Sequence, residues 1–316
     1  MNRPLPLVRL FERRTRALRR QLSAAIAGKD TGVHQARVAS RRLREAVPVL
    51  TEGLHHSKAG KAQRKIRRLT QALGSVRELD VTLHLIDELG ERPGVPRPAL
   101  AEVRAHVIED REERRKVMLE RLEDVDTDKL GRRLEAVRQA LMHPTPGHNW
   151  RAALALRIAK RGRRLDKAIE AAGQIYAPES LHQVRIAAKK LRYSLEIADE
   201  SGVAPCAPTL RAIKRVQDAL GRLHDLQILQ HHVAAVGAAP RPRRSTPDAG
   251  LGVLSRLIED ECRHLHGRYV ASQLSLREAV EAARRDIPVR LTAGTRAARS
   301  VKMSLAARRR AAGGHA

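Results

Sequence analysis

The chain has 316 residues and a net charge of +27, from 62 Lys and Arg against 35 Asp and Glu. A surplus of this size indicates a polyanionic partner, such as nucleic acid, an anionic membrane or a phosphate polymer. The two cysteines, Cys206 and Cys262, exclude a disulfide framework and lack a metal-ligand spacing, and aromatic residues make up only 2% of the chain. Proteins that grip single-stranded nucleic acid usually stack bases on aromatic side chains, so the partner need not carry bases.

Apolar residues recur at three- and four-residue spacing along almost the whole chain, which predicts an all-α fold. No segment approaches the roughly 18 apolar residues that span a bilayer, and the N-terminus lacks an apolar signal region. We therefore expect a cytoplasmic protein with no membrane partner. The expected helices cover residues 6–27, 31–55, 58–90, 97–124, 128–142, 149–173, 179–201, 207–237 and 250–284.

Clusters of Pro and Gly mark three loops, at 91–98, 143–148 and 237–250. The loop at 143–148 is the expected division between two halves, each of which is predicted to form a four-helix bundle. The last stretch, TRAARSVKMSLAARRRAAGGHA at 295–316, has no acidic residue and is expected to be either a frayed basic helix or a disordered tail. The predicted units are 1–142, a first helical repeat with 128–142 as a connector helix, 143–285, a second helical repeat, and 286–316, the basic C-terminal tail.

An internal repeat supports this division. HQARVASRRLR at 34–44 matches HQVRIAAKKLR at 182–192, with six of eleven positions identical at a shift of 148 residues. IRRLTQALGSVREL at 66–79 matches IKRVQDALGRLHDL at 213–226 at a shift of 147. In the preceding helices, the shift of 148 places Arg9, Arg13 and Arg16 on Arg157, Arg161 and Arg164. Three consecutive matching helices indicate that a helical unit was duplicated.

The repeated segments carry a cationic stripe. Successive residues of a helix are about 100° apart, so His34, Arg37, Arg41 and Arg44 share one stripe about 80° wide. The residues predicted to face the core are Ala36, Ala39, Ser40, Leu43, Val47 and Leu50 in the first copy, and Val184, Ala187, Ala188, Leu191, Leu195 and Ala198 in the second. A solvated helix face normally mixes Glu with Arg, whereas this stripe has one sign of charge and recurs in register. An anionic partner explains both features.

The histidines that begin the two stripes, His34 and His182, could serve three kinds of chemistry. Metal ligation is disfavoured because the neighbouring arginines repel a divalent ion and no carboxylate lies on the stripe. General base catalysis lacks a nucleophile and an orienting acid on the stripe. Phosphate ligation fits best, because a protonated imidazole donates from both ring nitrogens.

The two ladders of the form HxxRxxx[RK][RK]LR, each followed one helix later by ALG and an acidic-Leu pair, resemble the CHAD family, the conserved histidine α-helical domain. The resemblance covers roughly residues 5 to 285. It implies two pseudo-symmetric four-helix bundles whose basic helices line a central groove. It also implies binding of inorganic polyphosphate and, in some members, targeting to polyphosphate granules. One position departs from strict histidine symmetry: Arg77 stands in the first half where His224 stands in the second.

Carried over residue by residue, the resemblance implies a polyphosphate-binding set drawn from both halves. The set comprises Arg9, Arg13, Arg16, His34, Arg37, Arg41, Arg44, Arg67, Arg157, Arg161, Arg164, His182, Arg185, Lys189, Arg192 and Lys214. Arginines one helical turn apart, about 5.4 Å, can meet successive phosphates of a polymer that has no bases to read. Facing stripes from two bundles would concentrate positive potential in one groove.

Many CHAD relatives carry a CYTH domain with an ExExK signature, which this sequence does not contain, and it also lacks a Walker phosphate-binding loop. We therefore expect a stand-alone polyphosphate-binding protein in the cytoplasm or at polyphosphate granules, with no enzyme activity, cofactor or metal. Two alternatives remain open. One is a basic nucleic-acid-binding protein of the nucleoid type, and nucleic acid is in any case expected as a weaker partner. The other is a metal- or phosphate-handling enzyme that uses the histidines.

Overall fold

The computed structural model describes residues 5–27, 29–54, 57–239 and 249–312, and every regular element within these ranges is a helix. The all-α prediction is therefore confirmed. The centre of the expected loop at 237–250 lies outside the described residues, as do the last residues of the tail. The helices are α1 (Pro6–Ile26), α2 (Asp30–Leu50), α3 (Ser57–Ala72), α4 (Gly74–Gly90), α5 (Arg97–Glu123), α6 (Thr127–Met142), α7 (Trp150–Ala172), α8 (Pro178–Glu200), α9 (Ala207–Ala238) and α10 (Ala249–Ala312).

Local chemistry sets several of these helix ends. Asp126 accepts a hydrogen bond from the backbone N–H of Lys129 at 2.7 Å and so begins α6, and Asn149 does the same for Ala152 at 3.1 Å and begins α7. Pro178 stands in the first turn of α8, where its missing N–H costs nothing. These signals explain why most helix bounds match the expected ranges within a few residues.

The expected helix at 58–90 is two helices, because the chain turns at Leu73 between α3 and α4. The corresponding Leu220 and Gly221 of the second half lie inside the unbroken helix α9. Since both halves carry the same Leu-Gly pair, the local sequence does not decide between them. Packing differs instead: α3 packs against α2 and α6, whereas α4 packs against α5 and α9.

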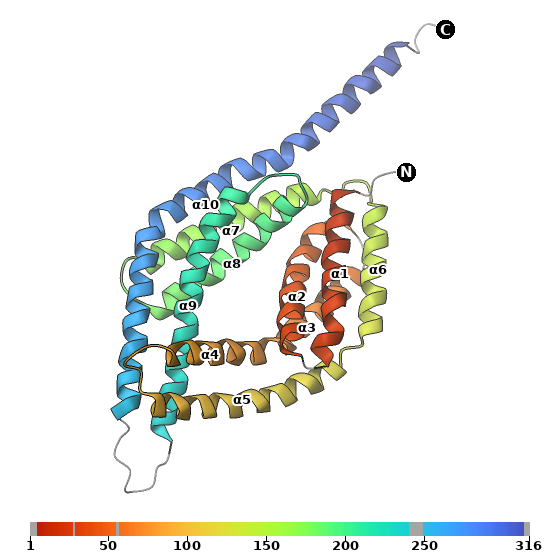
Figure 1. The fold of residues 1–316 in the computed structure, drawn as a ribbon. Helices are drawn as coiled ribbons and strands as arrows, with labels where there is room; N and C mark the ends of the chain where they lie inside the picture. The colour runs from red at the N-terminus through yellow and green to blue at the C-terminus, as the bar shows by residue number, and fades with distance from the viewer. Residues whose placement is uncertain (1–4, 28, 55–56, 240–248, 313–316) are drawn as a thin grey trace.

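Figure 1 shows α1, α2, α3 and α6 side by side in one group, with the α4–α5 pair reaching across to the second group, α7 to α10. The helix expected as a connector, α6, packs on both α1 and α3. The helix α10 runs without a break through residue 286, the predicted start of the tail, with Pro288 inside it. The pseudo-symmetry of the halves and the division of the chain into units stay predictions.

Buried apolar side chains form one continuous cluster that includes residues from α1 to α10. The predicted core faces of α2 and α8 are confirmed except at Ala187, which is partly buried; Leu43 and Leu191, for example, are fully buried. Contacts of α2 with α7 and α8 join the two halves, and α4 and α5 add contacts with α9. In the described part of the chain, no helix combines the length and apolarity needed to cross a membrane.

Candidate functional site

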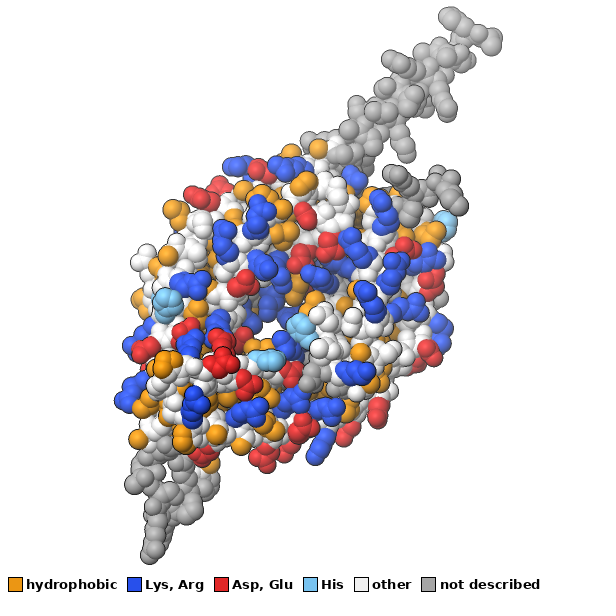
Figure 2. All heavy atoms as spheres, in the orientation of Figure 1, with side chains coloured by type: hydrophobic (Ala, Val, Ile, Leu, Met, Phe, Trp, Pro, Cys, Tyr) orange, Lys and Arg blue, Asp and Glu red, His pale blue; other side chains and the backbone are white. Residues whose placement is uncertain are grey.

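The basic stripes of α2 and α8 meet in the middle of the molecule. Because α2 packs against α8, Arg37 and Arg41 lie close enough to Lys189 for their charges to act on it. Arg41 acts in the same way on Arg185, and Arg77 of α4 acts on Arg37. We call Arg37, Arg41, Arg77, Arg185 and Lys189 the central basic cluster. Figure 2 shows Lys and Arg side chains around a hollow in the middle of this face, with histidine side chains at its edge.

The cluster carries like charges that are partly removed from water. Burial and the positive charges of Arg185 and Arg41 lower the pKa of Lys189 to about 7. Burial and the nearby Arg41 lower the pKa of Arg37 to about 10, and burial also lowers the pKa of Arg185. In addition, the buried Nε of Arg37 has no hydrogen-bond partner among the described residues. Each of these features disfavours the ligand-free cluster and would be relieved by a bound anion.

Acidic side chains border the cluster without neutralising it. Asp225 of α9 lies near Arg185 and Lys189, and burial raises its pKa despite these cations. Glu78 of α4 acts on the pKa values of Arg37 and Arg185, and also on that of Asp225. The two acids occupy equivalent positions of the duplicated segments at the shift of 147. Two carboxyl groups beside five cations leave the centre strongly positive.

A pocket lies at each end of the cluster. The first-half pocket, of about 460 Å³, is lined by α2, α4 and α5 and includes His34, Arg77, Asp80 and His84. The second-half pocket, of about 630 Å³, lies between the start of α8, α9 and α10. In the register of the sequence repeat, four residues of this pocket match four of the first-half pocket. They are His182, His224, Gln227 and His231, which match His34, Arg77, Asp80 and His84 in that order.

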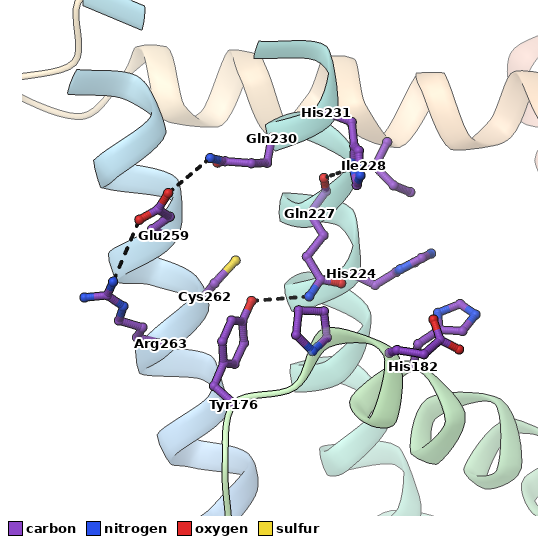
Figure 3. A pocket seen from close by; sticks show the side chains of 12 residues that line it. Tyr176, His182, His224, Gln227, Ile228, Gln230, His231, Glu259, Cys262 and Arg263 are labelled. Atoms are coloured by element: carbon purple, nitrogen blue, oxygen red, sulfur yellow. Dashed lines mark hydrogen bonds and ion pairs between the residues drawn. The ribbon is translucent and has the colours of Figure 1, made fainter. Parts of the chain in front are cut away.

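Figure 3 shows how the side chains of the second-half pocket lie. The rings of His182 and His224 are 4.7 Å apart between centroids and tilted by 46°. Burial, together with the charge of Arg185, lowers the pKa of His224 to about 4. Gln227 donates to the hydroxyl of Tyr176 at 3.3 Å, and the Cys262 thiol, whose pKa is raised by burial, lies beside them. In the ligand-free pocket, a neutral His224 therefore lies next to His182, with the uncharged Gln227 and Tyr176 beside them.

The first-half pocket carries permanently charged side chains, among them Arg77, Asp80 and Arg111. Burial and the positive charge of Arg77 lower the pKa of His34. Asp80, which is buried, accepts a hydrogen bond from Arg111 at 2.8 Å. The carboxylate of Asp80 also acts on His34 and partly offsets the effect of Arg77. The two equivalent pockets thus differ at the position shared by Arg77 and His224, where the positive charge is permanent only in the first half.

Several cations of the predicted binding set pair with acids where the halves meet. Arg13 donates to the Glu200 carboxylate at 3.1 Å, next to the buried Arg14, which binds the same carboxylate. Arg161 pairs with Glu45. Arg157 donates to the Glu45 carbonyl oxygen at 3.4 Å. We call these contacts the inter-half braces, since each joins an arginine of one half to a glutamate of the other.

The ends of the two stripes are also paired. Arg192 lies 3.5 Å from Glu196, a residue that Arg42 approaches from α2 at the same distance. Arg44 lies 3.8 Å from Glu45. The stripes are therefore least neutralised in their middle, at Arg37, Arg41, Arg185 and Lys189. The role of the paired cations in ligand binding stays a prediction.

The remaining predicted residues lie on the outside. Arg16 lines a shallow groove between α1 and α6 together with Arg19 and Arg138. Four other cations are exposed and form no ion pair with a described residue: Arg9, Arg67, Arg164 and Lys214. The structure does not bring these five into contact with the central basic cluster.

Residues that the predicted set leaves out complete the cluster and its border. Arg77 and His224 occupy matching positions in the sequence repeat, which was the available signal. Sequence alone does not show that α4 and α9 turn this position toward α2 and α8. Among the described residues, no group of three or more His, Cys, Asp or Glu side chains is arranged to hold a metal ion.

Comparison with known proteins places this geometry in context. A family model described as the CHAD domain matches residues 9–234. The chain is similar to the CHAD domain from the plant Ricinus communis, with 20% identity, a TM-score of 0.60, and coverage of 89% of this chain and 94% of that one. It is also similar to PptA from Streptomyces chartreusis, with 16% identity, a TM-score of 0.62, and coverage of 86% of this chain and 100% of that one. Both likenesses show a shared fold. No curated protein matches the chain significantly.

Proposed function

The chain belongs to the CHAD domain family, and we propose that it binds inorganic polyphosphate in the central basic cluster. The family is associated with polyphosphate binding. The observation that carries the proposal is the convergence of Arg37, Arg41, Arg185 and Lys189, two from each half, on one partly buried place. Burying like charges is unfavourable, and a polyanion passing between α2 and α8 would offset that cost.

The chemistry of the cluster favours a polymer of phosphates over nucleic acid. Binding of single strands relies on aromatic side chains that stack against bases. The aromatic ring beside the cluster, Tyr193, is buried, and the Arg192 guanidinium lies over it at 5.2 Å. Guanidinium and ammonium groups recognise phosphate oxygens and need nothing from a base. This arrangement supports binding of a chain that presents only phosphates.

We propose a binding protein without catalytic activity. The cations of the cluster are suited to hold negative charge, and the half-buried His224 stays neutral in the ligand-free protein. We also propose that polyphosphate binding recruits the protein to polyphosphate granules in the cell. Both proposals make the central basic cluster the feature on which function depends.

A pair of double variants tests the site. Arg41→Glu with Lys189→Glu reverses two charges inside the cluster, and the new carboxylates gain Arg37 and Arg185 as partners, so the fold is expected to persist. We expect the affinity for long-chain polyphosphate, measured by calorimetry, to fall about a hundredfold or more, since like charges in contact cost several kcal/mol. Fluorescent fusions of the same variants measure recruitment to granules.

The matched control is Arg42→Glu with Lys190→Glu, the next residues along the same helices. Both side chains are exposed and lie off the stripe, and the change in net charge is identical. We expect the control to lose less than about fivefold in affinity, which is the general effect of reduced charge. Equal losses in the two double variants would show that binding follows overall charge and would contradict the proposed site. Stronger competition by duplex DNA than by polyphosphate would favour the nucleic-acid alternative.

A further inference from the structure

A second cationic concavity lies on the outside of the first half, between α3 and α6. Its volume is about 380 Å³. We call it the outer groove, and its lining residues are Lys61, Arg64, Lys65, Arg68, Lys129 and Arg133. All six are Lys or Arg. They come from two helices that pack against each other, so the groove belongs to the folded structure.

The cations of the outer groove are poorly neutralised. None of the six forms an ion pair with another described residue. The carboxylate of Asp126 stands at the start of α6. Its pKa is lowered, first by the hydrogen bond from the Lys129 backbone and then by the charges of cations that include Lys65. Asp126 and Asp128, the acids at the start of α6, cannot balance six cations, so the groove is a place of positive potential with room for an anion.

The duplication alone does not produce this groove. The part of α9 that matches α3 keeps Arg211 and Arg215 at the positions of Arg64 and Arg68. It has Pro208 and Ala212 where α3 has Lys61 and Lys65. At the shift of 148, residues 127–142 of α6 fall on residues 275–290 of α10, which packs on α7 and α9 as α6 packs on α1 and α3. The two lysines of α3, Lys61 and Lys65, therefore distinguish the outer groove from the equivalent place in the second half.

The outer groove is separate from the central basic cluster. No residue lines both the groove and either pocket beside the cluster. Figure 1 places α6 at the outer edge of the first group of helices, on the side away from α8. A short anion in one site therefore leaves the other site open.

We propose that the outer groove binds a second stretch of inorganic polyphosphate. One protein molecule would then join two polyphosphate chains, or two distant segments of one polyphosphate chain. This inference rests on the proposed function of the central basic cluster. The groove lining offers only side-chain cations, with no aromatic ring or amide to contact a base, which favours phosphate chains over nucleic acid. Two sites on a rigid protein, each holding a segment of a long polymer, would crosslink that polymer.

The test counts bound short chains and measures crosslinking of long ones. In titrations with tripolyphosphate, we expect the wild-type protein to bind two chains and the Arg64→Glu, Arg68→Glu variant to bind one. The matched control is Arg211→Glu with Arg215→Glu, which makes the same change at the equivalent exposed positions of the other half. The control is expected to bind two. With long-chain polyphosphate, the light-scattering intensity of the groove variant should be at least about tenfold lower than that of the wild-type protein. The control should keep most of the wild-type intensity.

The outcomes separate the groove from the proposed function. Two bound chains in the groove variant, with scattering equal to that of the control, would overturn the inference. A groove variant that loses duplex DNA binding but keeps both polyphosphate chains would also overturn it, because the groove would then be a nucleic-acid site. The central variant, Arg41→Glu with Lys189→Glu, should retain one tripolyphosphate in the outer groove. If it retains two while the groove variant loses one, the proposed central site fails and the outer groove stands.

Discussion

The first-half and second-half pockets occupy equivalent places beside the central basic cluster, yet they differ in how they hold charge. In the first half, Arg77 is permanently charged, and Asp80 forms an ion pair with Arg111. In the second half, the same positions are His224, whose pKa falls to about 4, and the uncharged Gln227. The stripes repeat this contrast, since Arg41 of the first half is equivalent to Lys189 of the second, whose pKa falls to about 7.

This difference in charge suggests that the two halves contribute differently to one binding site. The arginines of the first half supply positive charge at any physiological pH. The second half can lose charge when no anion is present and regain it when one binds. This lowers repulsion in the ligand-free protein and links polyphosphate binding to proton uptake. The following predictions test that contrast.

The largest expected effect is on the pH dependence of affinity. A bound polyanion favours protonated Lys189, so binding above about pH 7 takes up a proton. The affinity for long-chain polyphosphate should therefore fall by up to about tenfold per pH unit between pH 7 and pH 9. The measurement is calorimetry in buffers of different ionisation enthalpy, which reports the protons taken up. Lys189→Arg, which makes the second half like the first, should flatten this dependence. An unchanged slope in that variant would remove Lys189 as the source.

A smaller effect is expected from exchanging the pocket residues. Arg77→His should weaken binding several-fold at pH 7.5, because the pocket loses a permanent charge, and the loss should shrink toward pH 5 as the new histidine becomes protonated. His224→Arg should strengthen binding several-fold at pH 7.5. Affinity measured at both pH values checks each variant. Identical effects of Arg77→His at pH 5 and pH 7.5 would show that the charge at this position does not matter.

The smallest expected effect is on the stability of the ligand-free protein. Lys189 has a lowered pKa in the folded state, so the unfolded chain binds its proton more tightly. The free energy of unfolding should therefore rise between about pH 7 and pH 10, while the penalty is fully present below pH 7. Lys189→Met should raise the free energy of unfolding by about 1 kcal/mol at pH 6, measured by urea denaturation. Lys190→Met, an exposed neighbour, should change it by less than about 0.5 kcal/mol. A destabilised Lys189→Met variant would contradict the repulsion on which the comparison rests.

Periodicity was sufficient to predict the helices and the faces of α2 and α8, because burial of Leu43 and Leu191 follows from helical spacing alone. The register of the internal repeat also pairs Arg77 with His224. What the repeat could not supply was the direction of α4, since the turn at Leu73 depends on packing that the equivalent Leu220 does not share.

The inter-half braces could not be predicted from the sequence either. Arg13 and Arg161 have the spacing of ligand-binding arginines, and only the contact between the halves brings Glu200 and Glu45 to them. A stripe read from one helix shows which residues share a face. It does not show which acidic side chains of other helices form ion pairs with those residues.

The continuous core has a consequence for the history of the chain. Apolar side chains from α1 to α10 form one cluster, and α2, α4 and α5 contact helices of the second half. A gene fragment that encoded one half would therefore specify an unfinished core with exposed apolar surface. Recombination at the 143–148 loop would be selected against for that reason, and the two duplicated copies would be inherited together. The charged residues of the two halves could then diverge, while both halves remained necessary to complete the common core.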